Sequence, residues 1–199
     1  TFNLRNAGER LTVDDIVLQG DSVFIRLPFF DSQFRAAFIS DEEIRGSWIK
    51  RLADRDLVMP FFAVRTGKKN IRFKTVNKKP IAKVTGRWSV TFFNPATERE
   101  TKAVGVFQQK GALLTGSFIT PSGDYRYLEG VVDGDSLKLS GFDGGYAIYF
   151  TAKINDGQTI SGGKYFSGAG VVPRSWEAYK NPAAALPDSL TLVNLKPGV

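Results

Sequence analysis

Apolar and polar residues alternate in short runs along most of this chain, and glycine, aspartate, asparagine and serine separate the runs. Such alternation is typical of β-strands, because successive side chains of a strand point to opposite faces. The segments with this pattern are 16–18, 23–27, 34–39, 88–93, 103–109, 113–120, 125–132, 136–139, 146–154 and 159–166. Their spacing of about ten residues, with turn signals between them, predicts an all-β protein whose antiparallel strands form a barrel or a sandwich.

Helix signals are scarce. Residues 41–53 could form a short helix, with Ser40 as its N-cap and Glu43 as the partner in a capping box. Gly46 and Trp48 in the same segment favour a strand instead. The sequence leaves both interpretations open here, and residues 175–179 are too few to assign.

An internal repeat is indicated by matching pieces of sequence in the same order. Residues 20–25 match residues 134–139, and residues 44–46 later parallel residues 160–162. Between these pieces, after a two-residue difference in length, Phe30, Asp31, Phe34 and Phe38 match Phe142, Asp143, Tyr146 and Phe150. The order suggests a duplicated three-strand unit, and its period of about 114 residues is too long for a solenoid.

A second pattern places a glycine between two apolar residues on one face of a strand. It occurs around Gly46, Gly86 and Gly116, with a partial copy at Gly162. Glycine in a strand leaves room for a neighbouring ring or for a sharp bend of a curled sheet. We therefore expect a meandering barrel or highly curled sandwich, similar in general shape to lipocalin-like and avidin-like barrels.

The chain of 199 residues contains no cysteine and no histidine. These absences exclude a disulfide, a cysteine nucleophile, a Ser-His-Asp relay and any metal site built on Cys or His. Catalysis would have to use carboxylates, lysine, tyrosine or a carboxylate-bound metal, and no such group stands in a recognisable catalytic context. We therefore expect a chain that is not itself an enzyme and that uses no cofactor and no metal.

The net charge of +7 is local, because nine basic residues and no acidic one lie between Arg65 and Arg87. The rest of the chain carries 18 basic and 20 acidic residues. A basic run can attract phosphates, but only Phe73 interleaves an aromatic ring with the charge, so a nucleic-acid site is disfavoured. We favour a solvated connector.

These signals divide the chain into four parts, expected to form one compact domain. Residues 1–64 form a first β segment with one copy of the repeat, and residues 65–83 form the basic connector. Residues 84–181 form the main β-meander with the second copy. Residues 182–199, with Pro182, Pro187 and little sheet periodicity, read as a linker or strap. No apolar run approaches the roughly 20 residues of a membrane helix.

One stretch resembles a known family. Residues 123–137, 139–144 and 150–153 carry the likeness, which is strongest from 86 to 166 and is supported by residues 188–191 and 195–198. The stretch resembles the N-terminal β-domain of bacterial envelope thiol-disulfide oxidoreductases of the TlpA/redoxin-like class. That family often has a cysteine near Gly141 and histidines near Gly144 and Val171, and this chain has neither.

The resemblance implies a non-catalytic accessory domain located in the periplasm or cell envelope. In that family a thioredoxin-fold domain with a Cys-x-x-Cys motif follows the Lys-Pro-Gly segment, which here is residues 196–198. We therefore expect the partner to be a C-terminal thioredoxin-fold domain or its protein clients.

A different class of function is a barrel that binds a small apolar or amphipathic ligand. The abundance of aromatic residues favours this alternative, and a third, weaker one is a cell-surface interaction partner. The candidate ligand-binding residues are Trp88, Arg126, Tyr127, Phe142 and Tyr146. Four of them have a plainer interpretation: Trp88 as core, Arg126 as a solvent-facing residue, and Phe142 and Tyr146 as parts of a structural turn at 142–146.

Overall fold

The computed structural model describes residues 1–67, 72–73, 77–125, 127–168 and 171–187. These residues form sixteen strands and no helix. The prediction of an all-β fold is therefore confirmed.

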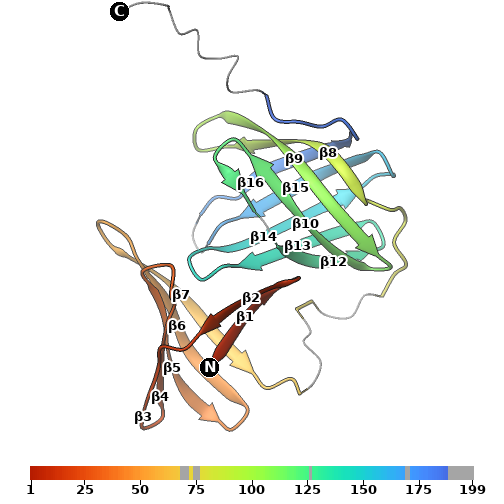
Figure 1. The fold of residues 1–199 in the computed structure, drawn as a ribbon. Helices are drawn as coiled ribbons and strands as arrows, with labels where there is room; N and C mark the ends of the chain where they lie inside the picture. The colour runs from red at the N-terminus through yellow and green to blue at the C-terminus, as the bar shows by residue number, and fades with distance from the viewer. Residues whose placement is uncertain (68–71, 74–76, 126, 169–170, 188–199) are drawn as a thin grey trace, which may run out of the picture.

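The C-terminal part of the chain is a closed antiparallel barrel of eight strands (Figure 1). Its strands are β8 (Gly86–Asn94), β9 (Arg99–Lys110), β10 (Leu113–Thr120), β12 (Leu128–Asp133), β13 (Ser136–Phe142), β14 (Ala147–Ile154), β15 (Thr159–Phe166) and β16 (Arg174–Lys180). Each strand pairs with the next, and β8 closes the barrel by pairing with both β9 and β16. The short strand β11 (Gly123–Asp124) pairs with the end of β10.

Large side chains fill the interior of the barrel. Trp88, Phe107, Phe118 and Phe150 are at most 1% exposed. The ring centroid of Phe118 lies 4.6 Å from that of Phe150 and 5.2 Å from that of Trp176. Such close aromatic packing makes the barrel a solid core. The described side chains therefore occupy the centre of the barrel.

Glycine makes room for a neighbouring residue in the barrel wall. A Cβ atom on Gly116 would lie 2.5 Å from the carbonyl oxygen of Val106 and 2.6 Å from the ring of Phe107. Neither atom can give way easily, because both belong to the adjacent strand β9. The interpretation of the glycine pattern as space for a neighbouring ring is confirmed at this position.

The N-terminal part of the chain forms a separate antiparallel sheet in the order β3-β4-β5-β6-β7. Its strands are β3 (Ile16–Gln19), β4 (Ser22–Arg26), β5 (Ser32–Ser40), β6 (Glu43–Arg51) and β7 (Asp56–Val64). Strand β6 decides the open question about residues 41–53 against a helix, because β5 and β7 on its two sides satisfy its backbone groups. Strands β1 (Phe2–Asn6) and β2 (Glu9–Val13) form a two-stranded hairpin, which lies between the sheet and the barrel (Figure 1).

The N-terminal sheet has its own small core. Val23, Ile25, Phe34 and Trp48 are buried together on one face of the sheet. Phe142, from the end of barrel strand β13, packs against this cluster. The sheet therefore uses a residue of the barrel to complete its core.

The matched repeat segments share strand order but not side-chain burial. Strands β4, β5 and β6 pair in succession, as do β13, β14 and β15. Phe34 is 4% exposed whereas its sequence match Tyr146 is 54% exposed. Phe38 is 47% exposed whereas its match Phe150 is fully buried. The matched aromatic residues therefore have different structural roles in the two segments.

Residues 77–83 of the basic connector pack against the barrel at the β12–β13 turn. The backbone N–H groups of Asn77 and Lys78 donate to the Asp133 carboxylate at 3.2 and 2.7 Å. Val84 is fully buried in the barrel core, while the side chains of Lys78 and Lys83 are exposed. The prediction of a solvated connector thus holds for these lysines, but the backbone between them is docked.

The described part of the predicted strap, residues 182–187, is anchored to strand β8. Ala184 is buried, and its carbonyl oxygen accepts two hydrogen bonds from the Arg87 guanidinium at 3.1 and 2.7 Å. Asn181 donates to the Ser89 hydroxyl at 2.9 Å. Residues 188–199 lie outside the described residues.

Candidate ligand-binding site

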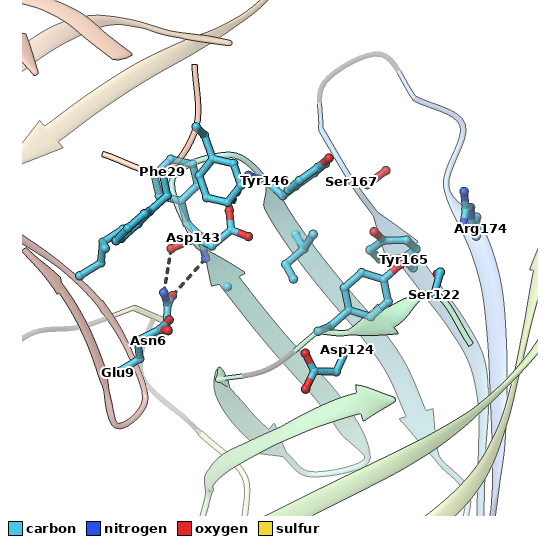
Figure 2. Close-up of a pocket in the computed structure, with 16 residues that line it drawn as sticks. Asn6, Glu9, Phe29, Ser122, Asp124, Asp143, Tyr146, Tyr165, Ser167 and Arg174 are labelled. Carbon is cyan, nitrogen blue, oxygen red and sulfur yellow. Dashed lines mark hydrogen bonds between the residues drawn. The ribbon is translucent and has the colours of Figure 1, made fainter. Parts of the chain in front are cut away.

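A cavity of about 760 Å³ lies at the end of the barrel that faces the N-terminal sheet. Three connections of the barrel line it: β10–β12 with Asp124 and Tyr125, β13–β14 with Phe142 and Tyr146, and β15–β16 with Ser167. The hairpin β1–β2 and the β4–β5 loop line the other side (Figure 2). The cavity therefore depends on how the sheet and the barrel meet.

The β13–β14 loop is the joint between the two parts. The Ser32 hydroxyl and the Trp48 indole N–H both donate to the carbonyl oxygen of Gly144, at 2.6 and 3.1 Å. The Lys50 ammonium donates to the carbonyl oxygen of Gly145 at 2.9 Å. Ser32, Trp48 and Gly144 are buried, so these bonds are made away from water. Side chains of the N-terminal sheet thus hold the loop through hydrogen bonds to its backbone carbonyl groups.

Phe142 is held on both its backbone and its ring. The buried Asn6 side chain donates to the Phe142 carbonyl oxygen at 2.7 Å and accepts from the Phe142 N–H at 3.0 Å, as Figure 2 shows. The Phe142 ring centroid lies 5.8 Å from the ring centroids of both Phe34 and Trp48. The hairpin and the sheet therefore fix this residue from two directions.

The loop is also ordered from within. One carboxylate oxygen of Asp143 accepts from the N–H groups of Gly145 and Tyr146 at 2.8 and 2.7 Å, which closes an Asx-type turn. A Cβ atom on Gly145 would lie 2.5 Å from the Phe30 ring. Residue 145 must be a glycine for the ring of Phe30 to pack here.

Aromatic rings form the rim of the cavity on the side of the sheet. Phe29 is 72% exposed and Tyr146 is 54% exposed. The Tyr146 ring stands edge-on to Phe30, with 6.2 Å between the ring centroids. The Lys50 ammonium lies 3.6 Å from the centroid of Tyr146, in cation–π contact. The rim therefore exposes aromatic surface at Phe29 and Tyr146, and the Lys50 ammonium covers one face of Tyr146.

Two tyrosines form the floor of the cavity above the barrel core. The ring centroids of Tyr125 and Tyr165 are 5.2 Å apart. Burial, followed by the hydrogen bond with Tyr125, raises the pKa of Tyr165 well above its ordinary value. The guanidinium carbon of Arg174 lies 5.9 Å from the Tyr165 ring centroid. The Tyr165 hydroxyl thus stays protonated at neutral pH and can donate or accept a hydrogen bond.

Arg72 of the connector fastens the hairpin to the barrel beside the cavity. Its guanidinium donates to the carbonyl oxygen of Ser140 at 3.0 Å, to the Asn6 amide oxygen at 3.2 Å and to the carbonyl oxygen of Arg5. Burial lowers the pKa of Arg72, and the negative charge of Glu129 opposes that shift. One residue of the basic run therefore serves as a structural clamp.

The structure brings together two of the five candidate ligand-binding residues. Phe142 and Tyr146 line the cavity. Trp88 lies in the barrel core, where its indole N–H donates to the Val84 carbonyl oxygen at 2.8 Å. Tyr127 does not line the cavity and adopts a left-handed backbone conformation with φ of 58°. Arg126 lies outside the described residues.

Several lining residues were missing from the sequence-based candidates. Glu9 comes from the hairpin, Phe29 from the β4–β5 loop, Asp124 from β11 and Arg174 from the start of β16. Each belongs to a different connection, and no motif joins them. Only the docking of the sheet on the barrel places them around one space.

Comparison with protein-family models, with curated proteins and with solved structures gave no match. Within the part of the chain that the structure describes, no helix is long and apolar enough to cross a membrane. Among those same residues, no group of three or more acidic side chains is arranged to hold a metal ion.

Proposed function

We propose that this chain is a non-catalytic accessory domain of a cell-envelope thiol-disulfide oxidoreductase, where it positions a redox domain or engages its client. The support is the family resemblance of residues 86–166, which cover most of the barrel. A chain without cysteine cannot itself exchange disulfides. Its contribution in such a protein is recognition or positioning.

The structural observation that favours this proposal is the joint at Gly144. Residues 139–144, which carry part of the resemblance, end in the loop that the N-terminal sheet grips through Ser32 and Trp48. The loop also borders the cavity through Asp143 and Tyr146. The resembling stretch thus supplies both the anchor of the sheet and one wall of an accessible recess, which suits a recognition domain.

The parent gene provides the direct test. We expect the reading frame to continue beyond Val199 into a thioredoxin-fold domain with a Cys-x-x-Cys motif. A stop codon directly after Val199, with no such motif downstream, would overturn the proposed fusion.

The intact parent protein tests the role itself. If this domain engages clients, Tyr146→Ala in the full-length protein should lower kcat/KM for reduction of a disulfide-bonded protein and leave kcat/KM for a small aromatic disulfide unchanged. The matched control is Phe62→Ala, since Phe62 is an exposed aromatic residue of the N-terminal sheet away from the cavity. Equal activity of all three proteins on the protein substrate would refute client engagement through this recess.

A second function, binding of a small amphipathic ligand, is favoured by one observation. The cavity combines exposed aromatic rings with carboxylates and hydroxyl groups, and its volume lies within the range of about 300–1,000 Å³ that is common for ligand sites. The site is at the barrel end, since the interior is filled. Native mass spectrometry of the purified chain should detect a retained or added ligand, and Tyr146→Ala should reduce the bound fraction.

A further inference from the structure

We propose that two copies of this chain associate through the outer face of the N-terminal sheet, which is the face opposite to its small core. The outer face points away from the hairpin and the barrel (Figure 1). This inference goes beyond both proposed functions, because it requires neither a redox domain nor a ligand in the cavity. It is carried by the apolar residues exposed on this face, by the balance of its charges and by its area.

Strand β7 has apolar residues on both of its faces. Leu57 and Phe61 pack against the core of the sheet, so the residues that alternate with them point to the outer face. Of these, Val58 is 53% exposed, Phe62 70% and Val64 54%. A strand with one solvated face normally alternates apolar and polar residues, and a continuous apolar run is typical of a strand covered on both faces. The second face of β7 therefore has the composition of a contact surface.

The outer face is complementary to itself in shape. Phe62 protrudes at the β7 edge of the sheet, and a shallow recess of about 320 Å³ lies at the β3 edge, where Val17 and Phe24 line it. The strand pairings place all three side chains on the same face. Two copies can therefore each place β7 over β3 and β4 of the other. Such a mutual contact is the kind that closes a two-fold dimer.

The charges of the outer face are nearly balanced. Three of its four arginines form ion pairs, which are Arg26–Asp15, Arg45–Glu43 and Arg51–Asp56. Only Arg35 of this face makes no ion pair with a described residue. A nearly neutral face can meet a copy of itself without the like-charge cost of a face with one sign. The outward positions of the five strands include no lysine, and interfaces are likewise enriched in arginine and aromatic residues and depleted of lysine.

The area of the outer face is sufficient for a weak dimer. The five strands are four, five, nine, nine and nine residues long. At about 3.3 Å per residue and about 4.8 Å between strands, they present a face of about 600 Å². A standard interface buries about 800 Å² on each partner, and weak interfaces bury less. We therefore expect a reversible dimer with a Kd of about 100 µM.

The free edge of β7 is a poorer route to association than its face. The Leu52 N–H donates to the Arg55 carbonyl oxygen and the Arg65 N–H to the Glu42 carbonyl oxygen, both at 2.8 Å. Odd-numbered residues of β7 therefore point their backbone groups to β6, and even-numbered residues point theirs to the free edge. Pro60 has no N–H to donate in the middle of this edge. It opposes extension of the sheet by another strand, so packing of the two faces is favoured.

Analytical ultracentrifugation of the purified chain tests the proposal. The protein should be monomeric at about 2 µM and mostly dimeric at about 500 µM. Added salt should not weaken the dimer, because apolar contacts hold it and screening reduces the repulsion between the two copies of Arg35. At a few micromolar and below, substitutions on this face should leave the properties of the monomer unchanged. A monomer at every concentration would overturn the proposal and leave the face to a different protein.

Two variants locate the contact. Phe62→Asp and Val17→Asp, at opposite edges of the face, should each raise the Kd of the dimer about tenfold or more, because each buries a charge in an apolar contact. The matched control is Phe93→Asp on β8, since Phe93 is an exposed aromatic residue of the barrel. Circular dichroism checks that all three variants remain folded. Equal weakening by all three would indicate non-specific association and would overturn the assigned face.

A spin label tests the arrangement of the two copies. The chain has no cysteine, so a nitroxide on Val64→Cys attaches at one site only. In a mixture with an isotope-labelled copy that carries no nitroxide, it should broaden the amide signals of Gln19 and Ser22 of that copy. Broadening confined to β7 would overturn the placement of β7 over β3 and β4. Broadening spread evenly over the sheet and the barrel would indicate random collisions and would overturn the proposal.

Discussion

At the scale of single residues, the Gly144 carbonyl oxygen carries much of the contact between the two parts of the molecule. It accepts from Ser32 and from Trp48, and both donors are at least 94% buried. A carbonyl oxygen has two lone pairs, so loss of one donor still leaves it satisfied. Loss of both leaves a buried acceptor without a partner, which costs more than a lost hydrogen bond.

Because Ser32 and Trp48 share one acceptor, the effects of mutating them on the free energy of unfolding should not be additive. Ser32→Ala and Trp48→Phe should each lower the free energy of unfolding by about 1–2 kcal/mol, and the double variant should lose more than the sum of the two. The measurement is a double-mutant cycle by urea denaturation. Ser175→Ala, at an exposed serine of the barrel, is the control. Strict additivity would show that the two donors act independently.

At the scale of elements, the β1–β2 hairpin is the part most dependent on others. A two-stranded hairpin alone has marginal stability in water, and this one is tied down by Asn6, which bonds to both backbone groups of Phe142. Val13 at the end of β2 contributes apolar burial. The hairpin should therefore open locally before the barrel does.

Asn6→Ala tests this expectation. The variant should raise amide hydrogen exchange in Phe2–Asn6 and Glu9–Val13 by about tenfold or more, since it removes the two hydrogen bonds with Phe142 and the one from Arg72, of about 1 kcal/mol each. Exchange in the rest of β13, at residues 136–141, should change little. Asn3→Ala provides the control, because Asn3 is exposed on the same strand. Uniform acceleration across the barrel would contradict a locally opening hairpin.

The elements also show what the sequence can predict. The strand predictions at 113–120 and 159–166 match β10 and β15, because their buried and exposed residues alternate clearly. Strand β7 was not predicted from the sequence, because its apolar run is continuous and contains Pro60. In the structure β7 is an edge strand, where a proline is tolerated. Strand β16 was not predicted because its segment is short, although Trp176 and Ala178 alternate with exposed residues.

The candidate site was predictable only in the segment that carries the family resemblance. Phe142 and Tyr146 stood out because they belong to a turn rich in aromatic residues and glycine. Glu9, Phe29 and Asp124 could not be found, because the hairpin, the β4–β5 loop and β11 meet only through tertiary contacts. Trp88, in contrast, was a candidate that does not line the cavity. Its large apolar ring is buried in the barrel core.

At the scale of the whole molecule, the barrel is the folding core and the N-terminal sheet is built against one end of it. Among the residues that the structure describes, the barrel core comprises nineteen buried residues, and the core of the sheet, with Val13 of the hairpin, comprises seven. Apolar burial is the main favourable term in folding. Most of the stability of the chain should therefore reside in the barrel.

Phe118 provides the sharpest test of a solid barrel. It is fully buried, and its ring contacts those of Phe92, Phe107, Phe150 and Trp176. In a filled core Phe118→Ala leaves a void that neighbouring strands cannot close, and should lower the free energy of unfolding by about 3–5 kcal/mol.

The matched control is Phe62→Ala on β7, where the ring is 70% exposed. Its effect should stay within about 0.5 kcal/mol, as for other surface substitutions. Both values come from urea unfolding followed by tryptophan fluorescence, which Trp88 and Trp176 report from inside the barrel. A loss below about 1.5 kcal/mol for Phe118→Ala would point to an interior that adapts or hydrates, contrary to a packed barrel. Such a result would favour a ligand site in the barrel interior over the one at the barrel end.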